Sequence, residues 1–307
     1  MLEITAYIFL TIGVGYLSVS CNIIRRESVP VLTSFAIYIA LPALIFKSTS
    51  ERAFAEILHL DYLAVYATAS LVTFLLVYFY SKRLAGNDMT SASIFAMGGS
   101  FSNSLMIGYP VLLGLFGEAA LVPLALCLLV ENFVIMPLTL ALGDIGRQHQ
   151  KTFFHAFLAT LPGLARNPII LSIIFGLLFS LFNLQTPGVV SKVVDLFAAS
   201  APAIALFSIG GLLVGSKIVG LGARIGPVLF AKLIVHPVLV ALLIMAFPNM
   251  DPMLKSSAVI MAAMPMFASY PVIGQRYELG SISASLLVVT TIASFITINL
   301  VVWVMAS

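Results

Sequence analysis

Charged residues are scarce in this chain of 307 residues. They make up 9% of the sequence, against roughly 25% in soluble domains. The 15 basic and 12 acidic residues are too few and too scattered to form a nucleic-acid-binding face. Hydrophobic residues make up 61%, and the mean hydropathy is +1.12. The sequence therefore predicts an integral, multi-pass protein of the cell (inner) membrane, surrounded by lipid and without a nucleic-acid partner.

Motifs for catalysis and cofactor binding are also missing from the sequence. The chain has no Gly-x-x-x-x-Gly-Lys-Ser/Thr nucleotide-binding motif, no nucleophile motif and no pair of carboxylates spaced for catalysis. Its two cysteines, Cys21 and Cys127, lack the spacing of a metal site or a disulfide. His149 and His155, six residues apart, are a weak metal signal. We expect a protein that is not an enzyme, holds no metal or other cofactor, and uses an H+ or Na+ gradient rather than ATP.

Apolar runs divide the chain into ten segments long enough to cross a bilayer, which takes about 20 residues each. The first run begins with the acidic Glu3 and is followed by Arg25 and Arg26. Because a secretion signal has its positive residues before the apolar run, we interpret this segment as a retained span. We expect spans at residues 3–21, 30–49, 61–82, 90–116, 119–142, 167–185, 189–215, 220–248, 254–276 and 280–305.

The basic residues between these spans gather on one side of the membrane. The opposite side has only Lys47, Arg52 and Lys255. The positive-inside rule therefore places the richer side in the cytoplasm and both termini outside the cytoplasm. The cytoplasmic set is Arg25, Arg26, Lys82, Arg83, Arg147, Lys151, Arg166, Lys217, Arg224 and Arg276.

Prolines recur at matching places in the two halves of the chain. Pro42 and Pro202 are each followed by Ala. Pro110 and Pro271 are each preceded by Tyr, and they lie 68 and 69 residues after the first pair. Because five spans is an odd number, the second half enters the membrane from the opposite side, so the repeat is inverted. We expect a first repeat at 1–142 (spans 1–5), a cytoplasmic linker with a short interfacial helix at 143–166, and a second repeat at 167–307 (spans 6–10).

The fourth and ninth spans each carry polar residues beside a Tyr-Pro pair. Proline removes an N–H and clashes with the carbonyl four residues back, so we expect unwinding near residues 108–110 and again near residues 265–271. Two half-helix N-termini that cross near the bilayer midplane would favour an anion, above all a carboxylate. The alternative is a pair of proline kinks that bind no ligand. The candidate substrate-binding residues are Ser102, Asn103, Ser104, Gly108, Tyr109, Pro110, Ser269, Tyr270 and Pro271.

Three ionisable residues inside predicted spans are functional candidates, because such residues are costly in a bilayer. Glu131 is the clearest carrier of a coupled proton, since desolvation penalises the charged carboxylate unless a cation such as Lys232 lies near. A structural hydrogen bond is its alternative role. Lys232 and His236 are four residues apart and share a helix face. They could neutralise an anionic substrate or pair with Glu131, or Lys232 could only snorkel.

Three other charged residues have expected structural roles near the ends of spans. Lys192 and Asp195, three residues apart, are predicted to form a local ion pair near the outer surface. Arg276 follows Pro271 by five residues and is expected to anchor the headgroup region at the cytoplasmic end of its span.

Three stretches resemble the auxin efflux carrier family, which includes plant PIN exporters and bacterial malonate permease-like carriers. They are Leu-Thr-Ser-Phe-Ala-Ile-Tyr-Ile-Ala-Leu-Pro-Ala-Leu-Ile-Phe (32–46), Phe-Ser-Asn-Ser-Leu-Met-Ile-Gly-Tyr-Pro-Val-Leu-Leu-Gly-Leu-Phe-Gly (101–117) and Ala-Leu-Phe-Ser-Ile-Gly-Gly-Leu-Leu (205–213). The resemblance covers nearly the whole chain. It implies an all-helical, ten-span inverted repeat of the bile-acid symporter type, in which spans 4 and 9 are broken by proline and cross.

The same resemblance implies how the protein works. Spans 1, 2, 6 and 7 would form a scaffold, and spans 3–5 and 8–10 a mobile transport part. Asn103 would contact the substrate carboxylate, with Pro110 and Pro271 at the crossover. The chain lacks the long cytoplasmic loop of the plant exporters, and its third span has no acid beyond its first residue, Asp61. These differences argue against auxin as its substrate.

These observations together predict a secondary active transporter that moves a small organic anion by an elevator mechanism, with a proton as the coupled ion. One alternative is a sodium-coupled organic anion symporter of the bile-acid type. Another is a membrane sensor that binds a ligand without moving it, although no soluble signalling domain accompanies the spans. We also expect a homodimer, because related carriers pair through the scaffold, whose spans carry long aliphatic stretches such as 169–182.

Overall fold

The computed structural model describes residues 2–52, 58–147, 152–215 and 226–306. Within these ranges the chain is helical throughout apart from short connections, and its one β-type pairing is an antiparallel bridge between Ser102 and Met266. Six helical stretches are long and apolar enough to cross a membrane, and two shorter apolar helices accompany them at Ala6–Ser20 and Pro168–Leu181. The six are Arg26–Ser50, Leu60–Leu84, Ser104–Arg147, Gly188–Leu213, Gly226–Ile244 and Gly280–Met305. The protein is thus an all-helical, multi-pass membrane protein, as its composition predicts.

The chain folds into two units, each assembled from separate stretches of sequence. The first unit holds residues 1–59, 105–126 and 165–215. Its elements are α1 (Leu2–Ser20), η1 (Arg26–Ser28), α2 (Val29–Phe35), η2 (Ala36–Ala40), α3 (Leu41–Ser50), α7 (Tyr109–Phe116), η5 (Gly117–Ala120), α11 (Pro168–Leu181) and α12 (Gly188–Leu213).

The second unit holds residues 60–104, 127–164 and 216–307. Its elements are α5 (Leu60–Phe79), η3 (Tyr80–Leu84), α6 (Met89–Ser100), η6 (Glu131–Ile135), α9 (Met136–Arg147), α10 (Phe153–Leu164), α13 (Gly226–Phe230), η7 (Ala231–Val235), α14 (His236–Ile244), α15 (Pro252–Ala262), α16 (Tyr270–Arg276) and α17 (Gly280–Ala306). Two helices pass from one unit to the other, η4 (Ser104–Gly108) and α8 (Leu121–Val130).

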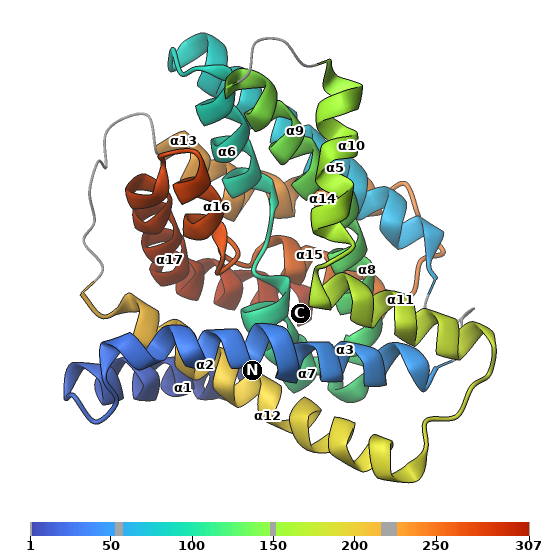
Figure 1. The fold of residues 1–307 in the computed structure, drawn as a ribbon. Coiled ribbons are helices and arrows are strands. Elements are labelled where there is room, and N and C mark those ends of the chain that lie inside the picture. The colour runs from blue at the N-terminus through green and yellow to red at the C-terminus, as the bar shows by residue number, and fades with distance from the viewer. Residues whose placement is uncertain (1, 53–57, 148–151, 216–225, 307) are drawn as a thin grey trace. The chain divides into compact units, whose positions relative to one another are not determined.

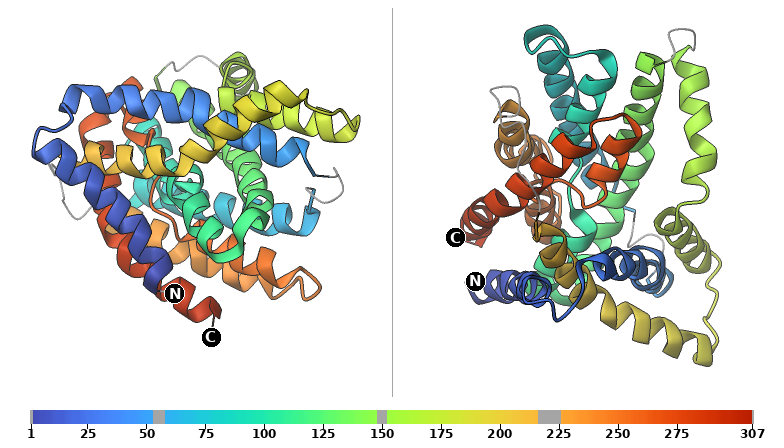
Figure 2. Two further views of the ribbon diagram at one scale, coloured as in Figure 1. Left: turned by 90° about the horizontal axis from the view of Figure 1, so that it is seen from below. Right: turned by 60° about the vertical axis from the view of Figure 1, so that its left-hand side comes forward.

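Close helix packing in the first unit depends on glycine. Helix α1 lies along α12, which in turn packs on α2 and α3, and α3 also packs on α11 (Figures 1 and 2). At the crossing of α1 and α12, Gly15 meets the carbonyl of Phe207, and Gly210 meets the carbonyl of Ile12. A methyl group at either glycine would collide with that backbone. Small residues let membrane helices approach this closely because packing, rather than the hydrophobic effect, drives their association.

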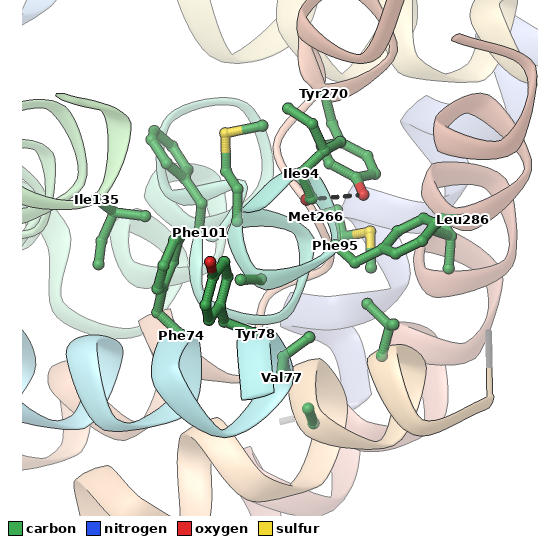
Figure 3. Close-up of a cluster of buried hydrophobic side chains, with 14 of the residues drawn as sticks. Phe74, Val77, Tyr78, Ile94, Phe95, Phe101, Ile135, Met266, Tyr270 and Leu286 are labelled. Carbon is green, nitrogen blue, oxygen red and sulfur yellow. Dashed lines mark hydrogen bonds between the residues drawn. The ribbon is translucent and has the colours of Figure 1, made fainter. Parts of the chain in front are cut away.

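In the second unit, α6 packs on both α5 and α9. A hydrophobic cluster joins its helices, and Figure 3 shows Phe74, Phe95, Phe101 and Leu286 among its members. The hydroxyl of Tyr270 reaches into this cluster and donates a hydrogen bond to the carbonyl of Ile94 at 3.1 Å. The helical start of α6 is fixed by Asp88, whose side chain caps the N–H of Ser91 at 2.8 Å.

Four of the π-helical turns end two residues before a proline. These turns are η2, η4, η6 and η7, and the prolines that follow them are Pro42, Pro110, Pro137 and Pro237. In a regular α-helix the proline ring clashes with the carbonyl four residues before it. A wider π-turn moves the preceding carbonyls away and relieves this clash. The chain therefore stays helical at these prolines instead of unwinding. Such turns are frequent at functional sites.

One expectation about surface charges needs correction, and a second gains a partner that the sequence did not predict. Asp195 pairs with Lys47 of α3 at 2.6 Å and not with its neighbour Lys192, because α3 packs along α12. Arg276 pairs with Asp144 of α9 at 3.0 Å, and the ring of Tyr277 lies beneath its guanidinium. Arg276 therefore ties the end of α16 to α9, and its contact with the headgroup region remains a prediction.

The linker between the halves contains the expected helix, α10, which packs along α9. Its placement at the membrane surface remains a prediction. Four residues used in the sequence argument lie outside the described residues: His149, Lys151, Lys217 and Arg224.

Candidate functional site

Two interrupted helices meet inside the second unit. Helix α6 ends at Ser100, and helical structure resumes at Ser104, which leaves Phe101–Asn103 extended. Helix α15 ends at Ala262, and α16 begins only at Tyr270. The two interruptions run antiparallel and pair, since Ser102 bridges Met266 and the N–H of Asn103 donates to the carbonyl of Pro265 at 2.8 Å. The stretches at residues 90–116 and 254–276, which were expected to meet, therefore pair at their interruptions.

The first interruption lies earlier in the chain than the proline predicts. The expected unwinding near residues 108–110 is wrong, because Gly108 closes η4 and Pro110 lies in the first turn of α7. The π-turn η4 comes directly before α7, so the helix that begins at Ser104 continues through Pro110. The chain instead unwinds at Phe101–Asn103, directly after Gly98, Gly99 and Ser100, which are poor helix formers. Pro271 likewise lies in the first turn of α16, while Pro265 lies inside the interruption.

A buried carboxyl group, that of Glu131, faces the first interruption from η6. Its Oε1 accepts hydrogen bonds from the Ser104 hydroxyl at 2.6 Å, the Tyr66 hydroxyl at 3.1 Å and the Ser102 N–H at 3.2 Å. Its Oε2 is buried and has no hydrogen-bond partner among the described residues. The Glu131 carboxyl group thus lies at the N-terminal end of the helix that resumes at Ser104 (η4 and α7), where the helix dipole favours a negative charge.

A buried ammonium group, that of Lys232, faces the second interruption from η7. Its Nζ donates to the carbonyl of Ala262 at 2.9 Å and to the hydroxyl of Ser102 at 2.6 Å. Ala262 is the last residue of α15, so the ammonium lies at the negative end of that helix dipole. Glu131 and Lys232 are both fully buried. In the part of the chain that the structure describes, no ion pair within 4.0 Å joins them, and Ser102 links the two instead.

Helix α5 adds a row of polar residues that sequence reasoning missed. Tyr62, Tyr66 and Ser70 recur every fourth position and are all buried. Tyr62 contacts the thiol of Cys127 at 3.0 Å, Tyr66 contacts Glu131, and Ser70 contacts the ring of His236 at 3.0 Å. Four-residue spacing puts side chains on one face of a helix. That spacing, in an otherwise apolar span, is the signal that could have identified them.

The chain is similar to known membrane proteins over nearly its whole length. The family model for the membrane transport proteins matches residues 1–303. The chain belongs to this family, the auxin efflux carrier family. It is 30% identical over 306 residues to a Rhizobium meliloti (strain 1021) protein named "Putative malonate transporter", covering 97% of this chain and 95% of the relative. It is 27% identical over 314 residues to an uncharacterized transporter of Methanocaldococcus jannaschii, and the alignment covers 99% of this chain and 98% of the relative.

Among the candidate residues of this transport protein, five come together in the second unit: Ser102, Ser104, Glu131, Lys232 and His236. Asn103 lies between Ser102 and Ser104 in the sequence and is also buried. Ser269 precedes α16, and Tyr270 and Pro271 begin it, but the Tyr270 hydroxyl points to Ile94.

Gly108, Tyr109 and Pro110 belong to the first unit, where the carbonyl of Pro110 accepts the Tyr7 hydroxyl at 2.7 Å. Within the described ranges, no three His, Cys, Asp or Glu side chains are placed to hold a metal ion.

Proposed function

We propose that this transporter moves a small organic anion, with a carboxylate as its recognised group, across the membrane as a secondary active carrier. The observation that carries the proposal is the pairing of two helix interruptions beside a buried cation, Lys232. Interrupted helices in transporters hold substrate because their backbone groups are free to bind it. The amide of Asn103 stands at this pairing and is the proposed contact for the carboxylate. The name of the Rhizobium relative makes malonate the first substrate to test.

The charges of Glu131 and Lys232 support a proton as the coupled ion. While Glu131 is ionised, the cluster holds one positive and one negative charge. A proton on Glu131 would leave Lys232 as an uncompensated buried cation, and such a charge costs about 3–5 kcal/mol. Binding of an anion would remove that cost. Proton and anion therefore favour each other's binding, which is the thermodynamic basis of proton-linked anion transport.

The division into two units supports an elevator mechanism. The first unit gathers spans 1, 2, 6 and 7 of the proposed ten-span inverted repeat, together with residues 105–126. The second unit contains the paired interruptions and the buried charges. Movement of the second unit as a body would carry a bound anion with it. This grouping differs from the scaffold that the family resemblance implies in one respect. Residues 105–126, in the proposed spans 4 and 5, belong to the first unit and not to the transport part.

The decisive experiment is uptake into proteoliposomes. Small mono- and dicarboxylates, malonate among them, are screened while proton and sodium gradients are imposed separately. We expect a proton gradient to accelerate uptake and a sodium gradient to have no effect. Acceleration by sodium alone would favour the bile-acid type of coupling. Binding without flux would favour a sensor.

Asn103→Ala tests the substrate site. We expect the variant to remain folded and monodisperse but to bind the transported anion about tenfold or more weakly, because it loses a hydrogen bond to a charged group. Asn299→Ala, which removes an exposed amide from α17, is the matched control and should bind normally. A dissociation constant unchanged in Asn103→Ala would remove this residue from the site.

We further propose that the protein is a homodimer paired through its first unit. Helix α11 presents a row of exposed apolar side chains, including Phe175, Leu178 and Leu181. Native mass spectrometry in mild detergent and from nanodiscs should give the mass of two protomers. A single protomer under both conditions would contradict the proposal.

A further inference from the structure

His236 occupies a fixed place between Lys232 and Ser70. Its Nδ1 lies 3.1 Å from the Lys232 Nζ, and its Nε2 lies 3.0 Å from the Ser70 hydroxyl. All three side chains are fully buried. The ring also packs against Tyr66, with 5.6 Å between the ring centroids. Both ring nitrogens are therefore engaged, and the ring cannot turn without losing two contacts.

The charge of Lys232 determines which ring nitrogen of His236 can carry a hydrogen. A lysine ammonium has three N–H donors and no acceptor. Two of these donors go to the carbonyl of Ala262 and the hydroxyl of Ser102. The third meets Nδ1 of His236, which must then be unprotonated so that it can accept. A neutral histidine with a bare Nδ1 carries its hydrogen on Nε2, and that hydrogen points at Ser70.

We infer that His236 is a positioning residue: it holds Lys232 as a cation at the helix crossing by serving as its third acceptor, as the neutral Nε2–H tautomer. This role excludes His236 as the carrier of the coupled proton. An imidazolium would present an N–H to the ammonium, and the two positive groups would repel each other 3.1 Å apart. The inference deepens the proposed function, because a permanently charged Lys232 is what makes the proton on Glu131 control anion binding.

The alternative arrangement is chemically distinct. If Lys232 were a neutral amine, its lone pair could accept a hydrogen from Nδ1, and the Nε2 of His236 would then accept from the Ser70 hydroxyl. The tautomer of His236 therefore reports the charge of Lys232. No substrate and no ion gradient are needed to read it.

The test is nitrogen-15 NMR of histidine in the purified protein in nanodiscs. His59, His149 and His155 are replaced by Gln, so that His236 gives the only histidine signal. We expect a hydrogen bonded to Nε2 and a bare Nδ1 throughout the pH range of transport. A hydrogen on Nδ1, alone or together with one on Nε2, would overturn the inference. This result does not depend on whether a carboxylate is transported, so it can fail while the proposed function stands.

Two substitutions separate the two ring nitrogens. His236→Asn places an amide oxygen near the position of Nδ1 and can still accept from Lys232, whereas His236→Gln places its amide near Nε2 and cannot. We expect His236→Asn to keep kcat/KM for substrate exchange within about threefold and His236→Gln to lower it about tenfold or more. His155→Asn, on the exposed part of α10, is the control and should not change exchange. Equal losses in the two His236 variants, or a larger loss in His236→Asn, would contradict the positioning role.

Discussion

At the scale of single residues, the site is defined by one oxygen that lacks a partner. Oε1 of Glu131 accepts three hydrogen bonds, while Oε2 accepts none. A buried oxygen without a partner is costly when charged, and the donors already surround Oε1. Oε2 is therefore the atom on which an added proton would reside. Loading and unloading that proton requires no rearrangement of the three bonds to Oε1.

Glu131→Gln tests this assignment, because glutamine copies the protonated acid. Its carbonyl oxygen can keep the bonds from Tyr66, Ser102 and Ser104, and its NH2 replaces the protonated Oε2. We expect acceleration by a proton gradient to be abolished, while exchange of substrate for substrate continues, since exchange needs no net proton movement. Both rates are measured in proteoliposomes.

The matched control for this change is Glu118→Gln. It makes the same substitution at a carboxylate in η5 of the first unit and should leave the proton response intact. Retention of the response in Glu131→Gln would give Glu131 a structural role.

At the scale of elements, the sequence predicted which helices are interrupted and where the second interruption lies, but it misplaced the first. The Tyr-Pro pairs correctly marked spans 4 and 9. A π-turn accommodates Pro110, however, so this proline lies within the helix that resumes at Ser104 and not in the gap. The actual gap at Phe101–Asn103 carries no proline at all. Its stability comes from pairing with a segment more than 150 residues away in the sequence, Ala263–Ser269, which local patterns cannot reveal.

The candidate site was predictable to a similar degree. Glu131, Lys232 and His236 were found because ionisable residues are conspicuous in apolar helices. Tyr66 and Ser70 were missed because tyrosine and serine are common in membrane helices and become significant only through their four-residue spacing. The partner of Asp195 was wrong for a related reason, since sequence neighbours were preferred over Lys47, which the packing of α3 on α12 brings near.

The crossing of α1 and α12 yields a prediction for stability. Gly15→Ala would push a methyl group into the carbonyl of Phe207, and overpacking of this kind costs about 1–3 kcal/mol. We expect a lower melting temperature in detergent by thermal-shift measurement. Gly13→Ala is the matched control on the same helix, because nothing lies within 4 Å of its added methyl. That control should be neutral or slightly stabilising, and a Gly15→Ala variant as stable as Gly13→Ala would contradict the close approach.

At the scale of the whole molecule, each unit draws on both halves of the sequence. The first unit contains α1 to α3 from one half and α11 and α12 from the other, and the second unit combines α5, α6 and α9 with α13 to α17. An inverted repeat produces this division when equivalent spans of the two halves serve the same purpose. The pairing of Ser102 with Met266 then joins equivalent interruptions. The buried charges are not duplicated, since Glu131 comes from the first half and Lys232 from the second.

The proposed topology can be tested with the two native cysteines. Cys21 is exposed just after α1, four residues before Arg25, and Cys127 is buried. Because the basic connections are proposed to be cytoplasmic, we expect a membrane-impermeant maleimide to label Cys21 in inside-out vesicles and not in right-side-out vesicles. Cys21→Ser should abolish the signal, since Cys127 is out of reach. Labelling of Cys21 only in right-side-out vesicles would reverse the proposed orientation, and would place both termini and all ten basic residues on the other side of the membrane.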